Sequence, residues 1–206
     1  MTTAAILLAA GESARMGSPK ALLPWGGVTL IEYQVRELAA AGIEDIVVVL
    51  GDAAEEVRGR VPPAGRVVVN EAYREGRASS LRAGAAALPD SAGPVLVLNV
   101  DQPRPREVHL ALLSAHQAGD ALITLPVAEG RRGHPTVLAG ALLPELRNVS
   151  EETQGLRRVV SAHRDETSEV EASSAVVLVD INTPAGYREA LARHGQTRPC
   201  SSTETP

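Results

Sequence analysis

Residues 4–20 read AAILLAAGESARMGSPK, a short apolar run followed by a loop that carries glycines and cations. The apolar run is typical of a buried strand in a parallel sheet. In the loop, Gly11 and Gly17 have no side chain that blocks a ligand's approach to the backbone N–H groups. Arg15 can bind two phosphate oxygens with its forked guanidinium, and Lys20 adds a movable point charge. The stretch therefore predicts a strand that leads into a polyphosphate-binding loop.

Two better-known glycine-rich fingerprints differ from this loop. The P-loop needs Gly-Lys followed by Ser or Thr, whereas here Ser18 and Pro19 separate Gly17 from Lys20. The dinucleotide fingerprint needs three closely spaced glycines that run straight into a helix, and Pro19 and Pro24 keep this segment irregular. Neither fingerprint therefore accounts for the loop.

Apolar runs alternate with Ala- and Leu-rich amphipathic segments along most of the chain. Such alternation predicts an α/β fold of three layers, in which helices cover both faces of a mostly parallel sheet. We expect strands at Ala4 to Ala9, Asp45 to Leu50, Arg66 to Asn70, Pro94 to Leu98, Ala121 to Pro126, Thr136 to Leu138 and Ala175 to Val179. We expect helices at Leu30 to Ala41 (with Gly42 as its C-cap), Ala53 to Arg60, Ser79 to Leu88, Pro105 to Ala118, Ala141 to Leu146, Gln154 to Ala162 and Pro184 to Arg193.

Length and composition limit the class of protein. With 206 residues and 44% hydrophobic content, the chain can build a sizeable core, and we predict a single domain over residues 1–193. Residues 194–206 are polar and unpatterned, so we predict a disordered tail there. A net charge of -5 and 2% aromatic content disfavour nucleic-acid binding. The single cysteine, Cys200, excludes an internal disulfide, and no apolar run suits a membrane span, so we expect a cytoplasmic protein.

Polar residues follow several of the predicted strands directly. Ligands of open α/β sheets bind outside the carboxyl ends of the strands, which makes these residues candidates for chemistry. Gly51 follows the second strand, Asn70 ends the third, and Asp101 comes shortly after the fourth. Asp101, followed by a stiffening Pro103, is well placed to hold Mg²⁺ against a triphosphate. The alternative is that Asp101 only caps the next turn or helix.

Three further segments carry candidate residues, each with a purely structural alternative. Ser79 is a suitable N-cap, and Ser80 lies where a helix N-terminus could direct it toward a ligand. His134 stands before Pro135 in a polar loop, and Pro135 favours extended backbone at His134; a lone loop histidine is more often structural than catalytic. Asp180 follows the last predicted strand and could give a metal a second oxygen ligand, as could Asn182. The alternative there is a strand-end Asp with Thr183 and Pro184 starting a helix.

The chain resembles the molybdenum cofactor type of nucleotidyltransferases, within the wider group that includes sugar-phosphate nucleotidyltransferases. The match covers the opening signature Leu8 to Lys20, then Leu22-Leu23-Pro24-Trp25-Gly26-Gly27, and extends over Ala4 to Tyr187. The resemblance implies a Rossmann-like fold of the glycosyltransferase-A type. It also implies that the opening loop, including Leu8, Ala9, Ala10 and Gly11, holds a nucleoside triphosphate whose phosphates contact Arg15 and Lys20.

The resemblance assigns roles to the other candidates too. Asp101-Gln102-Pro103 matches the family's metal-binding Asp, and Ser80 corresponds to a serine beside the base and ribose. Gly133-His134-Pro135 matches an element of the cytidylyltransferase branch on the acceptor side, where we expect positioning more than proton removal. Ala10 also favours CTP, because the guanine-using branch tends to have glycine there. Asn182 and Ala185 depart from the family's acidic residues, so Asp180 is ranked first as second metal ligand.

These inferences lead to one leading function and two alternatives. The leading function is Mg²⁺-dependent transfer of CMP from CTP to a terminal phosphate of the molybdenum cofactor, with release of pyrophosphate. Arg15, Lys20 and Asp101 would be the catalytic residues. A nucleotidyltransferase that acts on a sugar phosphate or another small phosphate is the first alternative. A non-catalytic, cofactor-handling partner of a molybdoenzyme is the second.

Overall fold

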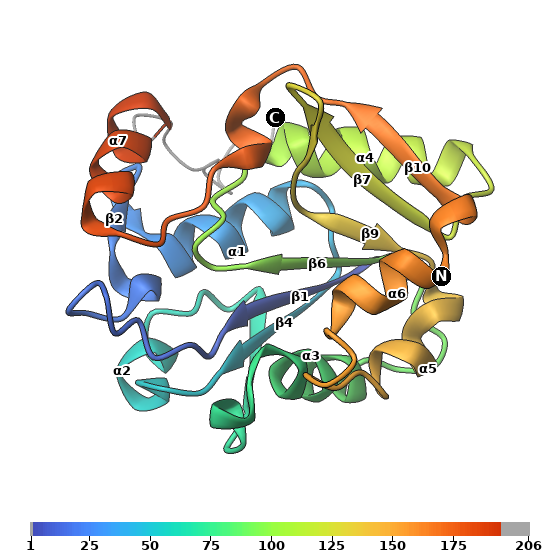
Figure 1. The fold of residues 1–206 in the computed structure, drawn as a ribbon. Helices are drawn as coiled ribbons and strands as arrows, with labels where there is room; N and C mark the ends of the chain where they lie inside the picture. The colour runs from blue at the N-terminus through green and yellow to red at the C-terminus, as the bar shows by residue number, and fades with distance from the viewer. Residues whose placement is uncertain (1, 195–206) are drawn as a thin grey trace, which may run out of the picture.

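The structure is a computed structural model and describes residues 2–194 (Figure 1). The predicted tail therefore lies outside the described residues, apart from His194, and so does Cys200. His194 is the last residue of helix α7 (Pro184–His194). In the part of the chain that is described, no helix combines the length and the apolar character needed to cross a membrane.

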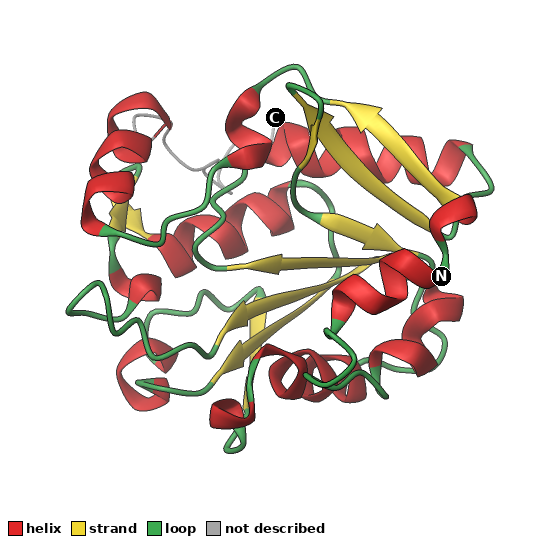
Figure 2. Cartoon of the chain, in the orientation of Figure 1, coloured by secondary structure: helices red, strands yellow, loops and turns green. Residues whose placement is uncertain are grey.

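The centre of the molecule is an eight-stranded, mostly parallel sheet, which confirms the predicted fold class (Figure 2). The strands lie in the order β10-β7-β9-β6-β1-β4-β5, and β8 pairs with β7. Strand β9 runs antiparallel to both of its neighbours, as does β8 to β7. Their bounds are β1 (Ala4–Ala9), β4 (Asp45–Leu50), β5 (Gly65–Val69), β6 (Val95–Asn99), β7 (Ile123–Ala128), β8 (Arg131–Arg132), β9 (Thr136–Leu138) and β10 (Thr167–Glu171).

Helices cover both faces of the sheet, with α1 and α4 on one face and α3, α5 and α6 on the other (Figure 1). Alternate residues of β1 serve the two cores: Ala5, Leu7 and Ala9 face the first, and Ala4, Ile6 and Leu8 the second. The helices are α1 (Leu30–Ala40), α2 (Ala54–Arg58), α3 (Arg77–Ala87), α4 (Arg106–Ala118), α5 (Leu143–Leu146), α6 (Leu156–Ala162) and α7.

Local sequence explains where α1 begins and ends. The Thr29 hydroxyl accepts a hydrogen bond from Glu32 N, and the Glu32 carboxylate accepts one from Thr29 N, forming a capping box. The helix is followed by Gly42 at φ 79°, the left-handed conformation that glycine adopts without steric cost. The predicted helix and its glycine C-cap are thus confirmed to within a residue.

The predicted strand Ala175 to Val179 is wrong. These residues begin with a 3₁₀ helix, η5 (Ala175–Leu178), whose first turn is capped by the Ser174 hydroxyl accepting from Val176 N at 3.2 Å. The reason is that a buried arginine takes the carbonyls of Val177 and Val179, which a sheet would otherwise need for pairing. Asp180 consequently follows an irregular segment and not a strand.

Three strands were not predicted from the sequence, and one predicted helix cap is wrong. Strand β10 has a largely polar sequence, and strands β2 (Pro24–Trp25) and β3 (Val28–Thr29) form a short separate hairpin; none of the three was predicted. Ser79 is not an N-cap, because α3 begins at Arg77. The Ser79 hydroxyl instead donates to Ala72 O and Gly76 O at 2.9 and 2.8 Å.

The strand order places the loops after β1 and β6 next to each other. From β1 the chain passes to β4 and β5 on one side and then returns to β6 on the other side of β1. The register pairs Leu8 with Asn99, and Val100 N donates to Leu8 O at 2.9 Å. Such a switch of direction leaves a crevice at the carboxyl ends of the two strands, where ligands of α/β folds bind.

Candidate active site

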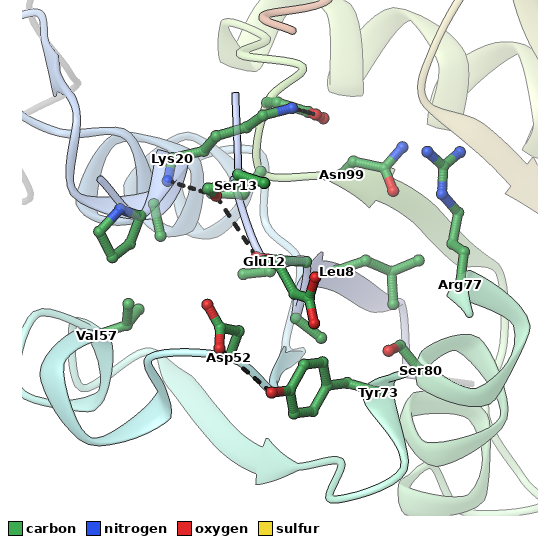
Figure 3. A pocket seen from close by; sticks show the side chains of 18 of the residues that line it. Leu8, Glu12, Ser13, Lys20, Asp52, Val57, Tyr73, Arg77, Ser80 and Asn99 are labelled. Carbon is green, nitrogen blue, oxygen red and sulfur yellow. Dashed lines mark hydrogen bonds and ion pairs between the residues drawn. The ribbon is translucent and has the colours of Figure 1, made fainter. Parts of the chain in front are cut away.

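A cavity of about 630 Å³ opens at this switch point (Figure 3). Its walls include the loop of residues 8–15 with Lys20, Arg77 and Ser80 of α3, and Asp101 and Asn182. The volume lies within the usual range for sites that hold a nucleotide or cofactor. The structure therefore brings most of the predicted phosphate and metal residues to one cavity.

Lys20 connects the phosphate loop to the side of the cavity that carries Asp101 and Asn182. Its Nζ donates to Asp101 Oδ2 at 2.6 Å and to Asn182 Oδ1 at 2.8 Å. The side chains of Lys20 and Asp101 are only 15% and 14% exposed, so water screens the pair less than it would at the surface. Lys20 N donates to the Ser13 hydroxyl at 3.0 Å, which fixes the backbone of the phosphate loop around Ser13. Asn182, ranked second from the sequence, is thus a direct contact of the central cation.

Backbone contacts hold the predicted base-binding residues. Ala10 is buried, and its carbonyl accepts from Asp52 N at 3.2 Å. A Cβ on Gly51 would lie 2.8 Å from Ala10 O and 2.6 Å from Tyr73 Cβ, so only glycine fits there. In this way Gly51 supports the cavity wall from behind.

Ser80 faces the cavity with its hydroxyl oriented by Asn70. Asn70 Nδ2 donates to Ser80 Oγ at 3.0 Å and to Ser79 Oγ at 2.8 Å, and all three side chains are buried. Asn70 was predicted to bind the nucleotide, but it is not among the cavity-lining residues of the described chain. Its side chain contacts Ser80, which does line the cavity. Asn70 thus supports a wall residue.

Side chains from α1 hold the loop that carries Asp101. Gln34 Nε2 donates to Asn99 O at 3.2 Å and to Gln102 O at 2.8 Å, while its Oε1 accepts from Arg104 N at 3.3 Å. The side-chain oxygen of Gln102, Oε1, accepts hydrogen bonds from Asn99 N and Asn99 Nδ2. Buried polar groups satisfied in this way fix one loop conformation. The Asp101 carboxylate is therefore presented by a rigid loop.

Arg104 is fully buried and organises the far side of the site. Its Nη2 donates to Val177 O and Val179 O, both at 2.8 Å, while Nε donates to His134 O and Nη1 to Pro103 O, both at 2.9 Å. Burial lowers the pKa of the guanidinium to about 9, which still leaves it charged at neutral pH. One cation thus ties together three segments that are distant in sequence.

The predicted acceptor residues lie beside this cation. Gly133 packs against the backbone of Val177 so closely that a Cβ would collide with the Val177 carbonyl oxygen. His134 N donates to the same carbonyl at 3.0 Å, and the peptide bond between His134 and Pro135 is cis. Burial, followed by the charges of Arg104 and Arg77, lowers the pKa of His134 to about 4. The ring is therefore neutral at pH 7.

Asp101 is a carboxylate that could hold Mg²⁺ in the cavity, whereas Asp180 is not among the cavity-lining residues of the described chain. Desolvation, followed by the charge of Asp101, raises the pKa of the Asp180 carboxyl, so the two carboxylates lie within electrostatic range of each other. Residues 2–194 contain no group of three or more His, Cys, Asp and Glu that could hold a metal on its own. Mg²⁺ commonly binds through one or two carboxylates and completes its shell with substrate phosphates and water, so Asp101, alone or with Asp180, could hold this ion.

Sequence reasoning missed four contributors to the site. Arg104 gave a readable signal, because Asp101-Gln102-Pro103-Arg104-Pro105 places a cation directly after the candidate metal ligand. Gln34 and the Lys20 contact of Asn182 gave none, since each depends on residues more than 60 positions away. Arg77 was passed over as part of a serine-bearing segment.

Comparison with known proteins decides the family. Residues 5–167 match the model described as the MobA-like NTP transferase domain. The chain belongs to this family. It is therefore a nucleotidyltransferase-type protein, and the matched part contains the phosphate loop, Asp101 and His134 but ends before Asn182.

Individual members of the wider group are similar over most of the chain. Nicotine blue oxidoreductase of Paenarthrobacter nicotinovorans is 34% identical over 169 residues, which are 74% of this chain and 78% of that protein. The chain spans only 29% of the bifunctional protein GlmU of Pelotomaculum thermopropionicum, with 40% identity over 132 residues.

Solved structures give the same result for the fold. Rv0371c of Mycobacterium tuberculosis H37Rv superimposes with a TM-score of 0.81 at 26% identity and covers 93% of this chain and 98% of its own. A structure of the same protein in complex with manganese has a TM-score of 0.79 at 25% identity, over 93% of this chain and 99% of its own. The nucleotidyl transferase Mth528 of Methanothermobacter thermautotroptrophicus has a TM-score of 0.77 at 26% identity, over 93% and 97%.

Proposed function

We propose that this MobA-like protein transfers CMP from CTP to a terminal phosphate of the molybdenum cofactor and releases pyrophosphate. The observation that supports it best is the cavity in which Lys20 Nζ lies 2.6 Å from the Asp101 carboxylate, beside the phosphate loop. Cations and a metal-binding carboxylate at one nucleotide-sized cavity are what phosphoryl chemistry needs for charge stabilisation.

In the proposed reaction, the chain's own residues position the reactants and stabilise charge. A terminal phosphate oxygen of the acceptor attacks the α-phosphorus of CTP, and the bond from the α-phosphorus to the bridging oxygen breaks as pyrophosphate leaves. Lys20 and Arg15 bind the phosphates whose negative charge grows on the leaving group. The acceptor phosphate is already ionised at neutral pH, so no protein nucleophile or general base is required, which agrees with a neutral His134.

Asp101, with Asp180 as second oxygen ligand, would hold the divalent metal. The ion would neutralise triphosphate oxygens and act as a Lewis acid. The manganese complex of Rv0371c supports a divalent metal in a related fold, and the donor set here favours Mg²⁺.

CTP is proposed over GTP on two features. Ala10 stands where the guanine-using branch tends to have glycine, and in the structure Ala10 is buried against Asp52. Gly133-His134-Pro135 is the element of the cytidine-using branch, and Arg104 anchors it. Leu8, Ala9, Gly11 and Ser80 complete the proposed nucleotide site.

The test is pyrophosphate release from each of the common nucleoside triphosphates, with Mg²⁺ or Mn²⁺, in the presence and absence of molybdenum cofactor. We expect release with CTP that depends on the cofactor. Release with a sugar phosphate in place of the cofactor would overturn the proposed acceptor. CTP binding without release under any condition would support a non-catalytic partner of a molybdoenzyme instead.

A redox reaction is a second candidate. Nicotine blue oxidoreductase of Paenarthrobacter nicotinovorans, 78% of whose length matches this chain, is named an oxidoreductase. A redox reaction predicts loss of absorbance of a reduced nicotinamide nucleotide with a quinonoid dye. The products separate the two functions, since transfer releases pyrophosphate and the redox reaction does not. Dye reduction by the wild-type protein without pyrophosphate release would favour the second candidate.

A further inference from the structure

Arg77, the first residue of α3, is a cation of the cavity with no role in the reaction proposed above. Its side chain lines the cavity and is exposed. Figure 3 shows the guanidinium extending from α3 toward Asn99, on the opposite side of the cavity from Lys20. Within residues 2–194, it makes no hydrogen bond or ion pair. All its donors are therefore available to a ligand.

The other cations near the site already have partners or roles. Lys20 is bonded to Asp101 and Asn182. Arg104 is buried among backbone carbonyls and cannot reach a ligand without losing them. Arg74 pairs with an acidic residue of the phosphate loop and stacks 5.3 Å from an aromatic ring. Among the described residues that line the cavity, Arg15 of the phosphate loop is the other open cation, and it belongs to the triphosphate side.

Electrostatics place the Arg77 charge on the acceptor side. Arg77 contributes to lowering the pKa of His134 and acts against the rise in the pKa of Asp180, so its guanidinium lies within electrostatic range of both. His134 is neutral and adds no positive charge, Lys20 is already paired with Asp101, and the acidic Asp180 would repel an incoming phosphate. A phosphate that approaches from this side needs a cation to bind it.

We infer that Arg77 binds the terminal phosphate of the acceptor, the group that attacks the α-phosphorus, and thereby selects phosphorylated acceptors. The inference rests on the proposed transfer reaction. The planar guanidinium can bind two oxygens of one phosphate and leave the third free to attack. Arg77 is then a substrate-binding residue on the side opposite to the leaving group.

The experiment measures phosphate binding without turnover, with inorganic phosphate as the probe. The protein is first loaded with Mn²⁺ and a cytidine triphosphate analogue that has a methylene group between the α- and β-phosphorus atoms. Inorganic phosphate is then titrated, and its ³¹P relaxation by Mn²⁺ gives its affinity. Nucleotide affinity is measured separately by calorimetry. Circular dichroism checks that each variant is folded.

Arg77→Met is expected to weaken phosphate binding about tenfold or more, as loss of a charge-assisted hydrogen bond does, and to leave nucleotide affinity unchanged. Arg77→Lys keeps the charge without the fork and should lose less. Arg36→Met, which removes an exposed arginine of α1, serves as the matched control and should lose nothing.

Three results would overturn the inference: no phosphate binding to the wild-type complex, unchanged phosphate binding in Arg77→Met, or an equal loss of nucleotide affinity in that variant. Failure of the proposed function gives a different pattern. In that case the wild-type protein releases no pyrophosphate with any acceptor, yet phosphate binding still depends on Arg77.

Discussion

The two halves of the site are built in different ways. The phosphate loop, residues 8–20, is held mainly by contacts within itself, such as Met16 N to Ser13 O at 2.8 Å and Lys20 N to Ser13 Oγ at 3.0 Å. The segment of residues 177–182 is held by Arg104, which lies 73 and 75 positions from the two carbonyls that it binds. The conformation of a loop that is held by its own residues can be predicted from its local sequence. The conformation of a segment that is held by a residue distant in sequence cannot.

The largest expected effect tests the bond between the phosphate loop and Asp101, whose backbone carbonyl accepts from Ile181 N of the other half. Lys20→Met and Asp101→Asn each remove one partner of the bond that joins them, and each should lower pyrophosphate release about 1,000-fold, as loss of a key electrostatic contact does. Steady-state kinetics with saturating CTP measure the change. Asp101→Asn keeps a similar shape, so its melting temperature should stay close to that of the wild type. Near-normal turnover in either variant would show that the site is elsewhere.

The second effect tests the segment held from a distance. Arg104→Met removes the arginine hydrogen bonds of four backbone carbonyls, of which Val177 O keeps the bond from His134 N, and should lower the free energy of unfolding by about 3 kcal/mol. Urea denaturation measures the loss, and hydrogen exchange should rise at residues 177–182 and 133–135 more than in the phosphate loop. Arg104→Lys, which can satisfy fewer carbonyls, should lose less. Equal exchange in both halves would contradict the contrast between them.

The third effect is a pH dependence that originates away from the phosphate loop. Burial, followed by the charge of Arg104, lowers the pKa of His109 to about 3 from an ordinary 6.5. The unfolded chain therefore takes up a proton first, and stability present above pH 6.5 is lost as the pH falls. Between pH 6.5 and 5.5 this histidine should cost about 1 kcal/mol, and His134 should add to the loss.

His109→Leu isolates that histidine, because it replaces a buried ring with an apolar side chain. Its unfolding free energy should fall less between pH 6.5 and 5.5 than that of the wild type. His163→Gln is the opposite control, since hydrogen bonds to Glu166 and Glu145 raise the pKa of His163 and stabilise the fold at low pH. A His109→Leu profile identical to the wild-type profile would mean that the pKa of the ring is the same in the folded and unfolded states.

The smallest effect concerns the contact between the halves on the Asn182 side. Asn182→Ala removes a single hydrogen bond to Lys20, which contributes about 1 kcal/mol, so turnover should fall only several-fold. Comparison with Asp101→Asn under the same conditions ranks the two partners of Lys20. A loss as large as that of Asp101→Asn would make the amide an essential ligand.

The contrast between the halves also explains which parts of the fold and of the site could be predicted from the sequence. The parallel sheet, the phosphate loop and Asp101 follow from local patterns: an apolar run, glycines and a strand-end carboxylate. The Ala175 to Val179 run is equally apolar but begins as a 3₁₀ helix, because Arg104 and His134 N bind the Val177 carbonyl that a sheet would need for pairing. The open guanidinium of Arg77 could not be distinguished from any surface arginine without the cavity around it.

The ammonium of Lys20 has a consequence for the order in which reactants bind. With Lys20 Nζ 2.6 Å from Asp101 and 2.8 Å from Asn182, the protein neutralises the carboxylate that we propose as metal ligand. A free divalent ion would have to displace a cation that then has no partner. An ion that arrives bound to a triphosphate brings phosphate oxygens with it. Lys20 can then exchange its hydrogen bond to Asp101 for one to a phosphate oxygen, so its charge keeps a partner. We therefore expect metal and nucleotide to enter together, and the resting protein to be protected from stray cations.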